Sequence, residues 1–508
     1  MSRESIAIAQ PRVSVAHIAA AAAYRIAFLS LTTHFALYLR YALSAVQFPF
    51  GLDYGEGIIW QQALLIPGQR MYGDITHFPF LVFHYPPVYH LAVRVIAALG
   101  APMLEAGRAL SVFCTLMSGG LVAALANDVI DPNTGRYWRL AGAAAGGLTM
   151  YCYWPVVFWS PFMRIDMLAI MLSLLGVWLA GRSFRTPLLL YPAVLSFVLA
   201  VFTKQSSIAA PIAAMVVCLT TDRRLAFKAF GLGLLVGLIG LAALIWMTDG
   251  GFIRHILLYN LNRFSLKLAA WTIYQETVPH ALFLIMALAG LIAGWRGLAG
   301  RGSRHAPLMA MLTLYLVLTS GTLVGLGKSG AAQNYFIEWM CVWSVMIGVL
   351  IAFSLNRTFG DGAVTRHWSV PALLLPAALV LQIAALPSGT NFGGDDPVRV
   401  GQLDALVDRI RDARQPVLSD DMVLLLKAGQ EVPWEPAIFA ELATTGRWNE
   451  QLIIDSITTR AWAFIVTEGK PSDLIYDSRF TPAVDRAIRE TYPRTEEQGG
   501  RILHLPPA

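Results

Sequence analysis

The sequence predicts a polytopic α-helical membrane protein with a small C-terminal α/β domain. Of its 508 residues, 56% are hydrophobic and only 14% are charged, whereas soluble proteins carry about 25% charged residues. The charges divide near residue 388, since 388–508 holds 19 of the 32 acidic and 13 of the 38 basic residues. Residues 1–387 therefore carry a net +12 and 388–508 a net −6. A single soluble enzyme is excluded, and we expect no nucleic-acid partner because the basic residues are scattered over many short loops.

Apolar runs long enough to cross a bilayer as helices, which takes about 20 residues, fill most of 1–387. We predict eleven spans, at 26–47, 109–126, 140–158, 165–181, 188–203, 205–220, 229–247, 279–294, 306–327, 335–355 and 369–387. The segment 86–99 is apolar but short, opens with two prolines and contains His90 and Arg94. We expect it to lie along the membrane interface.

The distribution of Lys and Arg orients these spans. With the N-terminus in the cytoplasm, the inner segments hold 14 Lys/Arg and the longer outer segments hold nine, as the positive-inside rule requires. This orientation exports the 388–508 domain, so we expect a bacterial cytoplasmic (inner) membrane protein with a periplasmic C-terminal domain. Outer loops 48–108 and 248–278 are long while every inner loop is short, which places any chemistry on the outer side.

The exported segment alternates helical and strand patterns. Apolar residues of 397–414 fall on one helical stripe. PVLSD (416–420) and AWAFIVTE (461–468) are typical of buried strands, and together these patterns predict the α/β domain.

Two acids follow the first span, in FGLDYGEGIIWQQ. Asp53 and Glu56 are three residues apart, so a helical turn would place both carboxylates on one side. Glycines at 51, 55 and 57 allow a close approach of the backbone to a ligand. The alternative is a pair of solvated acids at the membrane boundary.

The same outer loop continues with Tyr72-Gly73-Asp74 and with the run Tyr85-Pro86-Pro87-Val88-Tyr89. With the acidic motif, this resembles the GT-C superfamily of polyprenyl-phosphate-dependent glycosyltransferases, which includes protein O-mannosyltransferases and lipid A aminoarabinose transferases. The resemblance implies an acidic motif at the end of the first span and two juxtamembrane helices in the first outer loop. Related branches often have adjacent acids here, whereas Tyr54 and Gly55 separate them in this chain, which leaves the choice of base open.

Further candidates lie on the same predicted outer side. Arg164 and Asp166 in SPFMRIDMLA could simply pair at a helix start, but the resemblance implies that an acid in this loop lines the active site. Lys204 and Gln205 in FTKQSS could meet a lipid phosphate, or Lys204 could be a snorkelling lysine. Other candidate substrate or phosphate ligands are Tyr85, Arg254, Arg263, Lys328, Asn334 and Tyr335.

These residues suit transfer of a sugar from a lipid phosphate, a good leaving group that needs no general acid. One carboxylate would deprotonate the acceptor hydroxyl while cations stabilise the departing phosphate, and the attack inverts the anomeric centre. We predict Asp53 as the base, Glu56 as its alternate or as a substrate orienter, and Asp166 as the residue that orders the site. Lys204, with Arg254, Arg263 or Lys328, would hold the phosphate.

We therefore predict an inverting membrane glycosyltransferase with a polyprenyl-phosphate sugar donor and an envelope glycan, lipid or protein acceptor. A transporter or flippase of a lipid-linked substrate, or a non-catalytic envelope-assembly scaffold, are the alternatives. The histidines of the first loop (77, 84 and 90) fit no tight metal motif, so no cofactor is predicted, although a divalent metal stays open.

Overall fold

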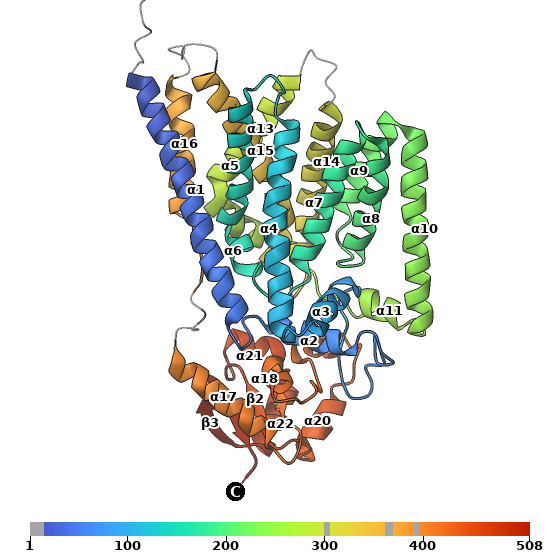
Figure 1. Ribbon diagram of the computed structural model, residues 1–508. Coiled ribbons are helices and arrows are strands. Elements are labelled where there is room, and N and C mark those ends of the chain that lie inside the picture. Colours follow the sequence, from blue (N-terminus) through green and yellow to red (C-terminus); the bar gives the residue numbers. More distant parts are fainter. Residues whose placement is uncertain (1–14, 299–304, 361–368, 391, 393–395, 508) are drawn as a thin grey trace, which may run out of the picture.

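A computed structural model describes residues 15–298, 305–360, 369–390, 392 and 396–507. Long helices form a bundle, and the C-terminal segment packs against one end of it (Figure 1). The first helix, α1 (Val15–Gln47), begins at the opposite end and runs to the C-terminal segment. Residues 1–14 of the N-terminal segment predicted to be inside (1–22), and parts of the loops 295–305 and 356–368 that are also predicted to be inside, lie outside the described residues.

Within the described residues, seven helical runs are long and apolar enough to cross a membrane. They are α1, α4 (Met103–Val129), α7 (Asp166–Ser183), α10 (Arg223–Met247), α12 to α13 (Leu266–Leu298), α14 to η5 (Ala306–Gly327) and η6 to α15 (Gln333–Phe359). Three predicted spans are shorter helices: α8 (Leu190–Val201), α9 (Ala209–Thr221) and α16 (Ser369–Ala384). The predicted multi-pass helical fold is confirmed.

Two predicted stretches differ in detail. The expected span 140–158 is interrupted, because α5 (Arg136–Thr149) passes through η1 (Met150–Cys152) before α6 (Trp154–Trp159) begins with Pro155 in its first turn. Proline has no backbone N–H, so it suits the start of a helix and not its interior. The outer loop expected at 248–278 contains the whole of α12 (Leu266–Thr277), which is capped by Ser265 and continues through a short 3-10 turn into α13 (Ala281–Leu298).

The first outer loop folds into two short helices, α2 (Tyr54–Leu65) and α3 (Val88–Ala98), which lie across the end of the bundle near α11 (Gly251–Ile253) (Figure 1). Arg94 of α3 donates hydrogen bonds to three carbonyls at the end of α2, those of Ala63, Leu64 and Ile66. A cation at these unpaired carbonyls stabilises a helix C-terminus. The two helices expected in this loop are therefore present.

The C-terminal segment is built on a four-stranded sheet of order β1-β2-β4-β3. Strands β1 (Leu418–Ser419) and β2 (Ile465–Thr467) are parallel, and β4 (Arg501–Leu505) pairs antiparallel with β2 and with β3 (Arg494–Gln498). The predicted α/β fold is confirmed. Its helices are α17 (Pro397–Arg411), α18 (Met422–Lys427), α19 (Pro436–Thr444), α20 (Gln451–Thr458), α21 (Leu474–Arg479) and α22 (Pro482–Thr491).

The first outer loop completes the core of this sheet-containing segment. Phe80 and Val82 pack in one apolar cluster with Trp434 and Phe439, and a second cluster joins Phe50 and other loop residues to α17 and α18. An isolated parallel bridge pairs Phe80 with Trp434. Because these side chains are shared, the two parts of the chain are fixed against each other, and a site can form between them.

Candidate active site

The acidic motif forms the N-terminus of α2. Asp53 is the N-cap and its Oδ2 accepts from the backbone N–H of Gly55 at 2.9 Å, while Glu56 Oε2 accepts from the N–H of Leu52 at 2.7 Å and of Asp53 at 3.4 Å. This is a capping box, in which two acids three residues apart satisfy the free N–H groups of a helix start. The two carboxylates do not point into one common site.

Glu56 is fully buried and paired with Arg108 of α4, which is also fully buried. Arg108 Nε and Nη2 donate to the two oxygens of Glu56 at 2.7 and 2.6 Å, and the backbone N–H of Met163 donates to Oε1 at 2.9 Å. Arg108 also donates to the carbonyl oxygens of Ala45, Phe48 and Phe50. Burial by itself would raise the pKa of Glu56, but Arg108 and the backbone N–H groups hold that pKa below its usual value. Glu56 thus joins the end of the first span to α4 as an anion.

Asp53 is more open, with 17% of its side chain exposed. Its Oδ2 accepts from Nη1 of Arg164 at 2.8 Å, and its side chain also accepts from backbone N–H groups at the start of α2. Burial raises the pKa of Asp53, and the neighbouring Arg164 offsets part of that rise. A partly exposed carboxylate with a raised pKa is suited to accept a proton.

Arg164 begins a chain of alternating charges. Its Nε lies 3.8 Å from Asp166 Oδ2, too far for a hydrogen bond, and its guanidinium lies over the ring of Trp159. Asp166 Oδ1 accepts from Lys204 Nζ at 2.7 Å and from Asn334 Nδ2 at 2.8 Å. The structure therefore brings together side chains from the starts of α2 and α7, the α8–α9 loop and η6.

Lys204 closes this chain. Its Nζ lies 4.8 Å from the ring centroid of Tyr335, a cation–π arrangement. Burial alone would lower the pKa of Lys204, but Asp166 raises it above its ordinary value, so the amine is charged. The arrangement differs from a snorkelling lysine, because Nζ points to a buried carboxylate.

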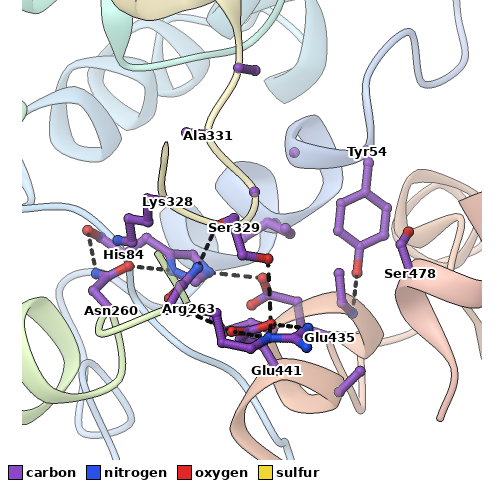
Figure 2. A pocket seen from close by; sticks show the side chains of 18 of the residues that line it. Tyr54, His84, Asn260, Arg263, Lys328, Ser329, Ala331, Glu435, Glu441 and Ser478 are labelled. Atoms are coloured by element: carbon purple, nitrogen blue, oxygen red, sulfur yellow. Dashed lines mark hydrogen bonds and ion pairs between the residues drawn. The ribbon is translucent and has the colours of Figure 1, made fainter. Parts of the chain in front are cut away.

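A polar cavity of about 650 Å³ lies between the end of the bundle and the C-terminal segment. Figure 2 shows Lys328 and Ser329 on one side of it, Tyr54 on another, and Glu435 and Glu441 from the C-terminal segment facing them. The cavity wall also includes Tyr85, Arg164, Asn334 and Tyr335. Asp53 lies just behind this wall, since Arg164 and Gly55, the two groups that contact its Oδ2, line the cavity.

The glycines of the acidic motif make room for protein rather than for a ligand. A Cβ on Gly55 would overlap Nη1 of Arg164, and one on Gly57 would lie 2.6 Å from Cβ of Met422 in α18. Gly55 thus allows the Asp53–Arg164 pair, and Gly57 allows the C-terminal segment to approach α2.

The remaining predicted phosphate ligands divide into two groups. Lys328 lines the cavity, where burial lowers its pKa, and Arg263 lines it while binding Glu441 through Nε and Nη2. Arg254 lies on the π-helical turn η3 (Arg254–Leu258), is exposed and does not line this cavity. The structure therefore does not place Arg254 with the other candidates.

An apolar groove of about 730 Å³ opens beside the cavity, between α8, α9, α10 and η3. Phe197, Met215, Phe227, Leu238 and Ile256 are among its lining residues. Gln205 and Pro86 also line the groove, and Gln205 Nε2 donates to the carbonyl of His84 at 3.0 Å. Tyr85 lines the cavity and the next residue, Pro86, lines the groove, so both hollows border the same loop segment.

Sequence reasoning missed three residues of this region. Arg108 resembles any other charge at the edge of a span, and His84 and Glu435 lie 351 positions apart in the chain yet are in contact. For Glu56, the Asp-x-x-Glu spacing could have predicted the capping box at the start of α2. Among the described residues no group of three or more His, Cys, Asp or Glu could hold a metal ion.

No protein-family profile and no curated protein matches the sequence. Solved structures do match. ArnT from Cupriavidus metallidurans, bound to undecaprenyl phosphate, superposes with a TM-score of 0.58 at 14% identity, covering 95% of this chain and 99% of ArnT. The oligosaccharyltransferase AglB from Archaeoglobus fulgidus, in complex with an inhibitory peptide and a dolichol-phosphate, gives a TM-score of 0.50 at 12% identity, covering 86% of this chain and 69% of AglB. The chain therefore has the predicted GT-C fold.

Proposed function

We propose that this protein is an inverting membrane glycosyltransferase that moves a single sugar from a polyprenyl-phosphate carrier to an envelope glycan, lipid or protein. The observation that carries the proposal is that one loop segment contributes to both hollows, since Tyr85 lines the polar cavity and the next residue, Pro86, lines the apolar groove. A long isoprenoid chain needs an apolar surface, and its phosphate needs cations. The fold shared with ArnT and AglB, whose structures contain undecaprenyl phosphate and dolichol-phosphate, supports this assignment.

In the proposed reaction the donor phosphate lies against Arg164, with Lys328 as a further cation of the cavity wall. Lys204 would add its charge from behind Tyr335, another residue of that wall. An acceptor hydroxyl attacks the anomeric carbon from the side opposite the phosphate. The bond from that carbon to the acceptor oxygen forms as the bond to the phosphate oxygen breaks, and polyprenyl phosphate leaves as an anion. Because no leaving-group proton is needed, one base is sufficient.

We propose Asp53 as that base. Asp53 is partly exposed and its pKa is raised, whereas Glu56 is fully buried and both of its oxygens are occupied by Arg108 and backbone N–H groups. A phosphate bound by Arg164 would compete for the guanidinium that now holds Asp53 Oδ2. Donor binding would then release the carboxylate for catalysis. Asp166 would hold Lys204 in place through the bond between them.

The test is transfer by purified protein from a panel of radiolabelled polyprenyl-phosphate sugars to a membrane acceptor extract. We expect labelled product with at least one donor and its loss in Asp53→Asn. Movement of the lipid across vesicles without covalent transfer would support the transporter alternative instead. Product formed at undiminished rate by Asp53→Asn would remove the proposed base.

We further propose that the C-terminal domain, 388–508, faces the periplasm of a bacterial cell and that the N-terminus is cytoplasmic. The excess of Lys and Arg in the predicted inner loops supports this orientation. Protease added to spheroplasts should cleave within this domain. If a protease site engineered on the surface of the domain stays uncut in intact spheroplasts, the proposed orientation is wrong.

A further inference from the structure

Glu435 is fixed by the first outer loop although it belongs to the C-terminal segment. Its backbone N–H donates to the carbonyl of Phe80 at 3.1 Å, and the N–H of Phe80 donates to the carbonyl of Pro433 at 2.8 Å. Its carboxylate Oε1 lies 2.8 Å from Nε2 of His84. Backbone and side chain are thus held by the same loop, at the wall of the polar cavity.

The second oxygen of this carboxylate is unpaired. Glu435 is 2% exposed, and among the described residues its Oε2 has no hydrogen-bond partner. Glu441, nearby in the same wall, is different, because Arg263 and Ser329 occupy both of its oxygens. A buried carboxylate oxygen without a donor is costly, so this position favours a ligand that supplies one.

The opposite wall indicates which part of a ligand reaches Glu435. Arg164 and Lys328 line the membrane side of the cavity and suit an anionic phosphate, which a carboxylate would repel. The group beside Glu435 is therefore a donor of hydrogen bonds that carries no negative charge, such as a hydroxyl group. In Figure 2 the carboxylate of Glu435 faces the cavity from the C-terminal segment, with Lys328 across from it.

We propose that Glu435 binds the hydroxyl hydrogens of a sugar ring, and that His84 orients its carboxylate for this contact. The inference rests on the proposed glycosyl transfer and names the sugar-binding side of that site. The ring belongs either to the sugar being transferred or to a glycan acceptor, since both present the same hydroxyl groups.

The experiment compares the KM for donor and for a glycan acceptor in wild type, Glu435→Gln and Glu435→Asp. A hydrogen bond to a charged group is worth about 1.5–3 kcal/mol, so we expect KM to rise about 10- to 150-fold for one of the two substrates. A rise for the donor identifies the transferred sugar, and a rise for the acceptor identifies the acceptor glycan. Gln at position 435 keeps an oxygen for His84 but loses the charge, whereas Asp keeps the charge but places it one methylene farther away. Because the two variants change the structure in different ways, a loss of binding common to both is not explained by one folding defect.

Glu431→Gln is the matched control. Glu431 lies on the same segment and pairs with Arg70 at 2.6 Å, but it is 41% exposed and does not line the cavity. Its substitution should leave both KM values within about two-fold. The same small change in both Glu435 variants would overturn the inference while leaving the proposed function intact.

A wild type that transfers no sugar would contradict the proposed function instead. The inference is then decided by equilibrium binding of polyprenyl-phosphate sugar and of polyprenyl phosphate without sugar. Weaker binding of only the sugar-bearing lipid in Glu435→Gln supports the contact. Equal affinities of the variant and the wild type for both lipids overturn it.

Discussion

Substituting the two acids of the α2 capping box separates a structural from a chemical role. Glu56 accepts two hydrogen bonds from Arg108 and three from backbone N–H groups, with no exposed surface on either partner's side chain. Glu56→Gln turns one acceptor oxygen into a donor and leaves Arg108 buried without its counter-charge. Breaking a buried ion pair in this way costs about 3–5 kcal/mol.

Asp53→Asn should give the reverse pattern. The Asp53–Arg164 pair is partly exposed, at 17% for both side chains, so the loss of stability should be much smaller than for Glu56→Gln. Transfer should fall by about 10²–10⁴-fold, the usual contribution of a general base.

The assay is thermal unfolding in detergent together with the transfer rate per folded molecule, measured below the unfolding range of each variant. The charge-free pair Glu56→Leu with Arg108→Met is the control, since replacing both partners of a buried pair removes the unpaired charge. It should recover stability relative to Glu56→Gln. The reasoning is refuted if Glu56→Gln unfolds like the wild type yet loses transfer, because Glu56 would then be the base.

Three other perturbations test the site. Asp53 acts as a base only when ionised, so kcat/KM should fall with decreasing pH, at a midpoint above the ordinary Asp pKa of 3.8. Arg164→Gln removes the cation that lowers the pKa of Asp53, so it should move this fall in kcat/KM to higher pH. An unchanged midpoint in the variant would contradict the assignment. Gly237→Leu places a side chain in the open groove, so it should raise the KM of donors with a long polyprenyl chain more than that of donors with a short one. Gly120→Leu is the control, because its Cβ also meets no neighbour but lies outside the groove. It should change neither KM. Lys204→Gln keeps a donor but removes the charge, so donor KM should rise with acceptor KM unchanged; a selective rise in acceptor KM would argue against a phosphate contact.

The helices were predictable because each apolar run carries its own signal. Hydropathy over about 20 residues and the bias of Lys and Arg are local properties, and the structure places helix at all of the predicted spans, with only 140–158 broken near Pro155. The lengths were less predictable. Helices α8 and α9 are separated by the loop that carries Lys204 and Gln205, and hydropathy does not mark where such a loop interrupts an apolar run.

The site was predictable only in part. Asp53, Arg164, Asp166 and Lys204 were singled out because a charge at a span end is costly without a role, and they do meet in space. The division of roles between Asp53 and Glu56 depends on Arg108, a partner 52 positions from Glu56. A local pattern indicates the helix cap but cannot indicate which acid has a buried counter-charge.

The residues with which the C-terminal segment lines the cavity could not be predicted from the sequence. Their position relates the uneven charge of the chain to the two sides of the cavity. The body, with its excess of basic residues, presents Arg164 and Lys328 to the cavity, and the acidic segment presents Glu435 from the other side. A ligand with a phosphate at one end and uncharged hydroxyl groups at the other matches this polarity in one orientation only. If the proposed function holds, this polarity predicts that the donor binds with its phosphate against the body and its sugar toward the C-terminal segment, and that the acceptor approaches along that segment. Exchanging the sign at either wall, by Lys328→Glu or by Glu435→Lys, should weaken transfer through different substrates, the donor phosphate in the first case and the sugar hydroxyls in the second.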